Sequence, residues 1–182
     1  MRYLLKKTVA MVGMMGAGKT AIGLALADRL GVTFRDSDEE IVRASNMSIA
    51  EIFDRDGEAF FREKETLVIG RLLDGAPGVL STGGGAFLSP TNREMIAAKG
   101  VAVWLDADVS LLWDRVRHKT TRPLLLTDDP RATLEALFAA RVPEYAQADL
   151  RVQTEAGFSI AETTDLVIEA LLARNDVLEK IA

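Results

Sequence analysis

The chain has 182 residues and a mass of 19.8 kDa, and its 48% hydrophobic and 27% charged residues are typical of one compact globular domain. Its net charge of −5 and pI of about 5.0 argue against a nucleic-acid partner, because a phosphate backbone needs a basic face. The chain contains no cysteine and a single histidine, which excludes disulfides, thiolate zinc sites, cysteine nucleophiles and metal sites built on two histidines.

The N-terminal residues, MRYLLKK, become charged again before any apolar secretory segment develops. We therefore expect no signal peptide and a cytoplasmic protein. The most apolar early stretch, 9–18, reaches only about half of the ~20 residues that a membrane span needs. It predicts a buried strand that runs into a glycine loop, and no membrane partner is expected.

Strand and helix patterns alternate along the chain. Nearly continuous apolar runs predict strands at 8–12, 32–34, 78–81, 101–105 and, more weakly, 150–153. Helical patterns lie at 19–30, 48–53, 58–73, 91–98, 109–117, 131–146 and 159–173. This alternation predicts a single α/β domain in which helices cover both faces of a parallel sheet.

Three places depart from the regular alternation. Pro143 is expected to end or kink its helix near Val142, because proline lacks the N–H that a helix needs. The stretch after Arg174 is acidic and is expected to be solvated. The segment 118–129 is polar and carries Arg122 next to Pro123 between two predicted helices. A surface connection and a mobile lid both fit this segment.

Residues 13–20, GMMGAGKT, fit the phosphate-loop pattern G-x-x-x-x-G-K-[ST] between a predicted strand and a predicted helix. Glycines in this pattern let the backbone turn its N–H groups inward, where they and the helix N-terminus hold phosphate oxygens. Lys19 adds a cation near the β- and γ-phosphates, and the Thr20 hydroxyl can ligate Mg²⁺. We therefore expect a nucleoside triphosphate and Mg²⁺. The expected nucleotide contacts are Gly13, Gly16, Ala17, Gly18, Lys19 and Thr20.

A pair of acids follows the predicted strand 32–34. Asp36 and Asp38 should project from its carboxyl end, the edge at which open α/β sheets bind ligands. Two solvated acids at a helix N-terminus are the alternative, because the helix dipole stabilises negative charge there.

Arg62 and Glu65 are three residues apart and share one face of the predicted helix 58–73. An exposed ion pair is the common meaning of this spacing. The neighbouring Phe60 and Phe61 favour a more specific interpretation, in which this part of the helix is anchored against the core.

A run of glycines, STGGG, ends the third predicted strand. Three adjacent glycines cost much backbone entropy, so close approach of a ligand explains them better than a plain turn. Arg122 in the polar segment, and Arg141 with Tyr145 on the next helix, add to Arg62. Arginine forks suit carboxylates and phosphates, although each of these arginines alone is also common on a surface.

Taken in order, these pieces resemble the shikimate kinase family. The matching stretches, between Val9 and Asp149, are GMMGAGKTAIG, FRDSDEEI, FFREKE, STGGG, TRPLL and RVPEYAQAD. The resemblance implies a P-loop kinase of the nucleoside monophosphate kinase type, with a five-stranded parallel sheet flanked by helices. The single kinase domain would have a lid near 118–129, a substrate-binding region near 36–65 and a weakly matched C-terminal region, 154–182.

The activity that the resemblance implies is transfer of the γ-phosphoryl group of ATP to the 3-hydroxyl of shikimate, in aromatic amino-acid biosynthesis. ATP and Mg²⁺ would be the cofactors, shikimate the small-molecule partner, and a monomer the active state.

On the nucleotide side, the resemblance implies that Thr20 and Asp36 serve the metal, with Ser81 near its water shell. Arg115 would lie against adenine. One position departs from the family pattern, because Ala21 stands where a second hydroxyl residue is common. The α-phosphate would then meet only a backbone N–H at this position.

On the acceptor side, the resemblance implies that Lys19, Asp38 and Arg122 are catalytic, with Arg122 reaching from the lid across the transferring phosphate. The implied shikimate contacts are Asp38, Arg62, Gly83, Gly84, Gly85 and Arg141.

Two other functions remain open from the residues alone. Another small-molecule kinase of this architecture, such as a gluconate or nucleotide kinase, needs a similar pocket, because gluconate also carries hydroxyls and a carboxylate. A module that binds ATP without phosphorylating anything is the second alternative. Arg122 in a lid favours turnover, since a mere binder has little need for a cation aimed at the transition state.

Overall fold

The computed structural model describes residues 1–119 and 123–182. Within them, five strands form one parallel sheet in the order β3-β4-β2-β5-β6. Their bounds are Thr8–Val12 (β2), Phe34–Asp36 (β3), Val79–Ser81 (β4), Gly100–Ala107 (β5) and Leu150–Thr154 (β6). The predicted α/β class and five-stranded parallel sheet are confirmed.

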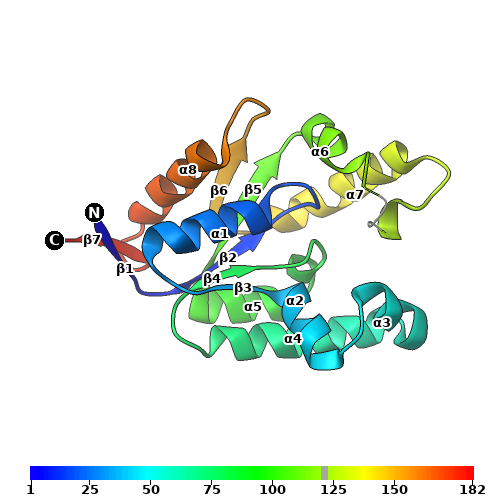
Figure 1. Cartoon of the computed structure of the whole chain (residues 1–182), viewed down its shortest axis with the longest axis horizontal. Coiled ribbons are helices and arrows are strands. Elements are labelled where there is room, and N and C mark those ends of the chain that lie inside the picture. The colour runs from blue at the N-terminus through cyan, green and yellow to red at the C-terminus, as the bar shows by residue number, and fades with distance from the viewer. Residues whose placement is uncertain (120–122) are drawn as a thin grey trace.

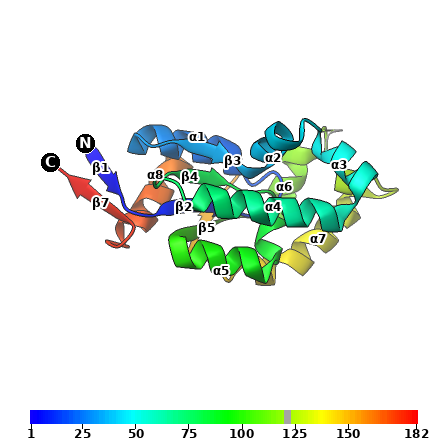
Figure 2. The same ribbon diagram turned by 90° about the horizontal axis from the view of Figure 1, so that it is seen from below.

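Helices cover both faces of this sheet (Figure 1). Helices α1 and α8 pack together on one face, whereas α5 lies on the other and packs against α4 (Figure 2). The bounds are Lys19–Leu30 (α1), Ser37–Ser45 (α2), Ile49–Asp56 (α3), Glu58–Leu73 (α4), Pro90–Lys99 (α5), Val109–Val116 (α6), Pro130–Tyr145 (α7) and Ile160–Leu172 (α8), with 3-10 turns at Ala86–Leu88 and Pro123–Leu125. Because parallel strands end at the same edge, the loops after β2, β3 and β4 become neighbours.

The centre of the sheet is apolar on both sides. Every residue of β2 and β5 is buried, which explains why these strands read as continuous apolar runs. Leu26 of α1, Ile96 of α5 and Ile168 of α8 belong to the same core. This core holds the sheet rigidly beneath the loops at its carboxyl edge.

A second, smaller apolar cluster lies among α2, α3 and α4. It contains Ile41, Ile52 and Phe61, and Phe53 packs against it. The ring centroids of Phe53 and Phe61 are 4.8 Å apart. The cluster packs these three helices together beside the sheet, and it fixes the first turns of α4.

The predicted strand 32–34 begins too early, since β3 runs over Phe34–Asp36. Asp36 is therefore the last residue of the strand, and it is also the N-cap of α2. Helix α2 was not among the predicted elements. Its sequence, SDEEIVRAS, buries only Ser37, Glu40 and Ile41, so it carries little apolar periodicity.

The prediction that Pro143 ends or kinks α7 near Val142 is wrong about the end, because α7 continues to Tyr145. Pro143 lies in the last turn, where the N–H that it lacks costs the helix a single hydrogen bond.

The chain's two ends form a separate antiparallel ribbon of β1 (Arg2–Leu5) and β7 (Leu178–Ile181). Figure 1 shows this ribbon at one end of the molecule. The expectation of a solvated segment after Arg174 is therefore corrected, since Val177 and Leu178 are fully buried. No helix within residues 1–119 and 123–182 has the length and apolar character that crossing a membrane would require.

Candidate active site

The loop between β2 and α1 has the backbone shape that its glycines allow. Gly16 and Gly18 have φ angles of 81° and 96°, in the left-handed region that favours glycine. At Gly13 a side chain would not fit, because a Cβ atom would lie 2.9 Å from the carbonyl oxygen of Leu105. Helix α1 begins at Lys19, so its unpaired N-terminal N–H groups face this loop. The geometry is that of an anion cradle.

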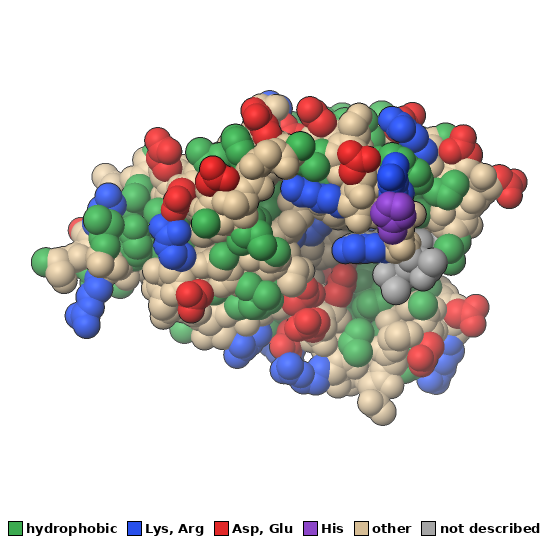
Figure 3. Space-filling view, turned by 45° about the horizontal axis from the view of Figure 1, so that its top comes forward, with side chains coloured by type: hydrophobic (Ala, Val, Ile, Leu, Met, Phe, Trp, Pro, Cys, Tyr) green, Lys and Arg blue, Asp and Glu red, His purple; other side chains and the backbone are tan. Residues whose placement is uncertain are grey.

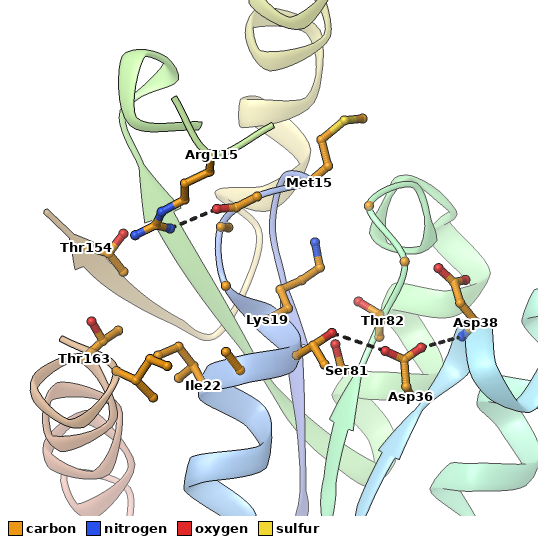
Figure 4. A pocket seen from close by; sticks show the side chains of 18 of the residues that line it. Met15, Lys19, Ile22, Asp36, Asp38, Ser81, Thr82, Arg115, Thr154 and Thr163 are labelled. Atoms are coloured by element: carbon orange, nitrogen blue, oxygen red, sulfur yellow. Dashed lines mark hydrogen bonds between the residues drawn. The ribbon is translucent and has the colours of Figure 1, made fainter. Parts of the chain in front are cut away.

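The Lys19 ammonium is held by the loop itself. Its Nζ donates hydrogen bonds to the carbonyl oxygens of Gly13, at 2.6 Å, and Met14, at 3.0 Å. Figure 4 shows the side chain directed into the cavity above the loop. A cation is thus placed where the predicted phosphates would lie.

The carboxylate of Asp36 has two distinct environments. Its Oδ1 accepts hydrogen bonds from the backbone N–H groups of Asp38, at 2.9 Å, and Glu39, at 3.2 Å, as an N-cap does. Its Oδ2 accepts one from the Thr20 hydroxyl at 3.4 Å. Asp36 therefore combines the helix-capping alternative with a place beside Thr20. Figure 4 shows its hydrogen bond with Asp38.

A cavity of about 520 Å³ extends from this loop toward α8, and we call it the phosphate-loop cavity. Arg115 crosses it, since its Nη1 donates to the Gly16 carbonyl oxygen at 2.9 Å. Thr154, Phe158 and Thr163 line its far part, and they were not predicted. They lie in the C-terminal region, whose sequence carries no specific motif. The residues predicted for the nucleotide and the metal line this cavity, with the exception of Gly13: they are Gly16, Ala17, Gly18, Lys19, Thr20, Asp36, Ser81 and Arg115.

A second cavity of about 570 Å³ lies between α3, α4 and α7, and we call it the arginine cavity. Arg62 of α4 and Arg141 of α7 both line it, and Arg141 is only 7% exposed. Phe53, Phe61 and Leu124 give it an apolar side. The predicted residues that line it are Asp38, Arg62, Gly83, Gly84, Gly85 and Arg141.

Arg62 is paired with a buried acid. Its Nη1 lies 2.9 Å from Oε1 of Glu65, whose side chain is 1% exposed. The ion pair is therefore not the exposed one that this spacing commonly indicates. Oε2 of Glu65 accepts no hydrogen bond from the described residues. Burial raises the pKa of Glu65 above its ordinary value, Arg62 opposes this rise, and the nearby Asp38 adds to it. The signal in the sequence was that Glu65 lies four residues after Phe61, on the buried face of α4.

The glycine run after β4 passes directly beside these charged groups. A Cβ atom at Gly83 would lie 2.9 Å from Oδ1 of Asp38, and one at Gly85 would overlap the guanidinium of Arg62. Close approach to the backbone, predicted from the three glycines, is therefore present. In this structure the close neighbours are the side chains of the site itself.

The two cavities share part of their walls. Met15, Asp38, Gly83 and Gly84 line both of them. Figure 3 shows that this face of the molecule is hollowed, with Lys and Arg side chains on one side of the hollow and Asp and Glu side chains on the other. A molecule in the phosphate-loop cavity would thus meet one in the arginine cavity beside Asp38.

Arg122 lies outside the described residues, so its place relative to the two cavities stays a prediction. Within the predicted lid, His118 and Lys119 are exposed, and Lys119 lines the phosphate-loop cavity. Leu124, from the later part of the same segment, lines the arginine cavity.

Comparisons with known proteins agree with this geometry. The shikimate kinase family model matches residues 15–172. The shikimate kinase of Ruegeria pomeroyi is 67% identical over 175 residues, which cover 96% of this chain and 90% of that protein. A solved shikimate kinase from Acinetobacter baumannii, in complex with shikimate, is 36% identical with a TM-score of 0.88, and the match covers 93% of this chain and 94% of that one.

A gluconokinase from Sinorhizobium meliloti has a TM-score of 0.60 at 20% identity, over 96% of this chain and 94% of its own. A likeness at that identity concerns the fold alone. The family model and these shikimate kinases match nearly the whole length of the chain. The chain belongs to the shikimate kinase family, whose members are ATP-dependent kinases.

Proposed function

We propose that this protein transfers the γ-phosphoryl group of ATP to the 3-hydroxyl of shikimate, which yields shikimate 3-phosphate and ADP. The observation that carries the proposal is the wall shared by the two cavities, with Asp38 in both. A phosphate donor in one cavity and a carboxylate-bearing acceptor in the other would bring their reacting atoms together there. Family membership supports both choices of ligand.

In this proposal the phosphate-loop cavity holds ATP. The backbone of Gly13, Gly16, Ala17 and Gly18 and the N-terminus of α1 receive the phosphates. The Lys19 ammonium gives up part of its hydrogen bonding to the Gly13 and Met14 carbonyls and neutralises the β- and γ-phosphates instead. The full negative charges of the phosphates attract the ammonium more strongly than a carbonyl dipole does. Arg115 and the far part of the cavity receive the adenosine.

The arginine cavity would hold shikimate. Arg62 and Arg141 offer two guanidinium forks to its carboxylate, and the backbone at Gly83, Gly84 and Gly85 lies close beside it. Asp38, near the donor, orients the attacking hydroxyl or accepts its proton. The bond from the hydroxyl oxygen to the γ-phosphorus forms as the bond from that phosphorus to the bridging oxygen breaks, and ADP leaves.

We assign the transition-state cation to Arg122, within a lid at about 118–129 that closes over the bound nucleotide. Closure would exclude water and strengthen the charge interactions at the γ-phosphate. The proposed organisation is one kinase domain, 1–182, with the region near 36–65 binding the acceptor and 154–182 contributing the adenosine end. The small apolar cluster of Ile41, Ile52 and Phe61 supports a distinct acceptor-binding part.

Mg²⁺ is the expected metal, and the donor set fits it. Thr20 and Asp36 present two hard oxygen ligands 3.4 Å apart at the edge of the phosphate-loop cavity. Mg²⁺ usually takes one or two protein oxygens and fills its octahedron with phosphate oxygens and water. When bound, it would neutralise charge on the phosphates. We expect the active protein to be a monomer and the reaction to take place in the cytoplasm.

An ADP-release assay with shikimate, gluconate and nucleoside monophosphates in parallel tests the proposal. We expect turnover with shikimate and at most background rates with the others. Faster ADP release with gluconate than with shikimate would mean that gluconate is the acceptor. Nucleotide binding without ADP release in the presence of any of the three acceptors would favour a non-catalytic ATP-binding module.

A further inference from the structure

Tyr145 is a fully buried tyrosine at the end of α7, one turn after Arg141. Its hydroxyl donates a hydrogen bond to the carbonyl oxygen of Gly84, which is 61 residues away in the sequence. The same hydroxyl lies 3.9 Å from Sδ of Met14 in the phosphate loop. One buried hydroxyl therefore touches both the glycine run and the phosphate loop.

The apolar core does not require this hydroxyl. The Tyr145 ring packs 6.2 Å from the ring of Trp104, a contact that phenylalanine would make as well. A buried hydroxyl destabilises the fold unless it is hydrogen-bonded. The Gly84 carbonyl provides that hydrogen bond for Tyr145. Burial raises the pKa of Tyr145 and outweighs the opposing effect of the Arg141 and Arg62 guanidiniums, so the hydroxyl stays protonated and able to donate.

The glycine run has no side chains with which to fix its own conformation. The carbonyl of Gly83 accepts from the N–H of Ala86 at 3.1 Å, and that of Gly85 accepts from the N–H of Leu88 at 3.2 Å. Both of these bonds are local. Among the described residues, the hydrogen bond from Tyr145 is the contact that ties the middle carbonyl to another element.

Fixing that carbonyl also fixes the next N–H. The Gly84 carbonyl and the Gly85 N–H belong to one planar trans peptide and point in opposite directions. Because the carbonyl turns toward Tyr145, the N–H of Gly85 turns away from it. Gly84 lines both cavities and Gly85 lines the arginine cavity, so the orientation of this peptide matters to the acceptor.

Helix α7 links this hydroxyl to a charged group. Arg141 lies four residues before Tyr145 and so on the same helix face. A Cβ atom at Gly84 would lie 3.2 Å from Nη1 of Arg141, which places that guanidinium against the same peptide.

We propose that Tyr145 is a positioning residue, which holds the Gly84 peptide in the orientation that binds the acceptor next to the phosphate loop. The inference rests on the proposed function and adds a residue to it. Tyr145 touches no reacting atom and acts through Gly84.

The variant Tyr145→Phe removes the hydroxyl and keeps the ring. We expect kcat/KM for shikimate to fall about three- to tenfold, through a higher KM and a lower kcat, which corresponds to one neutral hydrogen bond. KM for ATP should change by less than about twofold, since the phosphate loop loses only the weak contact between this hydroxyl and Sδ of Met14. The chain contains two tyrosines, and Tyr3→Phe, on β1 in the separate ribbon formed by the chain's two ends, is the matched control.

A merely structural hydroxyl would behave differently. Tyr145→Phe would then lower the melting temperature and leave kcat and both KM values of the folded protein at wild-type levels, which would overturn the inference. If wild type itself released no ADP with shikimate, the proposed function would fail and this inference with it. Normal wild-type turnover with unchanged Tyr145→Phe kinetics would reject this inference alone.

A spectroscopic measurement avoids removing the hydroxyl. In the Tyr3→Phe protein, incorporated 3-fluorotyrosine leaves one fluorine reporter, at position 145. We expect its ¹⁹F resonance to move when shikimate saturates the protein, because the hydrogen-bonded Gly84 peptide meets the ligand. A resonance that stays unchanged at saturating shikimate would contradict the positioning role, even if Tyr145→Phe did not fold.

Discussion

The guanidinium of Arg62 and the carboxylate of Glu65 are joined at 2.9 Å across one turn of α4, with Arg62 29% exposed and Glu65 1% exposed. Arg62 is thus partly exposed to solvent, whereas Glu65 is excluded from it. Arg62 faces the arginine cavity, whereas Glu65 depends on Arg62 for much of the compensation of its charge. Binding and stability are therefore coupled at this position.

Removal of Arg62 should damage both properties. We expect Arg62→Ala to raise KM for shikimate about ten- to a hundredfold, because a charged fork to the carboxylate is lost. The same change should lower the free energy of unfolding by roughly 1–3 kcal/mol, since Glu65 keeps a buried charge without its partner. Steady-state kinetics and urea unfolding measure the two effects separately.

The double variant Arg62→Ala/Glu65→Gln is the control for this prediction. It should recover most of the stability, because the buried charge is gone, and none of the affinity for shikimate. If the double variant regained shikimate affinity as well, Arg62 would act on the acceptor only by holding Glu65.

The raised pKa of Glu65 predicts how stability depends on pH. A carboxyl that holds its proton more tightly when folded than when unfolded stabilises the protein fully below its ordinary pKa of 4.5, and this contribution is lost as pH rises through the folded pKa. We expect Glu65→Gln to lack this decline. Urea unfolding from about pH 4 to about pH 8 should show the two stability curves diverging as pH rises, in favour of the variant. Parallel curves would mean that the folded pKa is ordinary.

Gly85 tests the steric arrangement of the site. Its φ of −94° is open to any residue, so alanine there introduces a clash without backbone strain. Because the new Cβ would overlap Arg62, we expect Gly85→Ala to displace that guanidinium and raise KM for shikimate about tenfold or more, at an unchanged KM for ATP. Gly75→Ala, whose Cβ would meet only a carbonyl oxygen at 3.5 Å, is the matched control and should leave both constants unchanged.

Asp38 tests the shared wall of the cavities. Asp38→Asn keeps the size of the side chain and removes its charge, so kcat should fall about 10²-fold or more if Asp38 orients the hydroxyl or takes its proton. ADP affinity measured without shikimate should change by less than about twofold. Asp54→Asn, at an exposed acid that lines the arginine cavity only, is the comparison. Equal losses in the two variants would indicate a general effect of negative charge.

The parts of the fold that could be predicted from the sequence are those with local causes. Helices α1 and α4 have the predicted bounds, and the phosphate loop adopts the shape that its glycines require. The strands β2 and β5 were found because burial on both faces produces an unbroken apolar run. Periodicity and motif spacing report such features directly.

The rest depends on contacts between distant residues. Pairing of Arg2 with Ile181 creates a ribbon from two short stretches whose own patterns are weak. The surroundings of the Arg62 and Glu65 pair come from other elements, since the charges of Asp38 on α2 and Arg141 on α7 act on Glu65, and no spacing within α4 reveals them. Likewise, the sequence does not indicate a role for the Tyr145 hydroxyl, because its hydrogen bond to the Gly84 carbonyl joins residues that are far apart in the chain.

The wall that the two cavities have in common has a consequence for inhibitor design. A single compound that carries an adenine nucleotide at one end and a carboxylate-bearing ring at the other would occupy both cavities, with its linker passing Met15 and Gly84. Once either end is bound, the other is held at a high effective concentration beside its own site, so the compound would bind more tightly than either half alone. The linker must be short and free of branches at its centre, because the backbone of the glycine run and the carboxylate of Asp38 leave it little width.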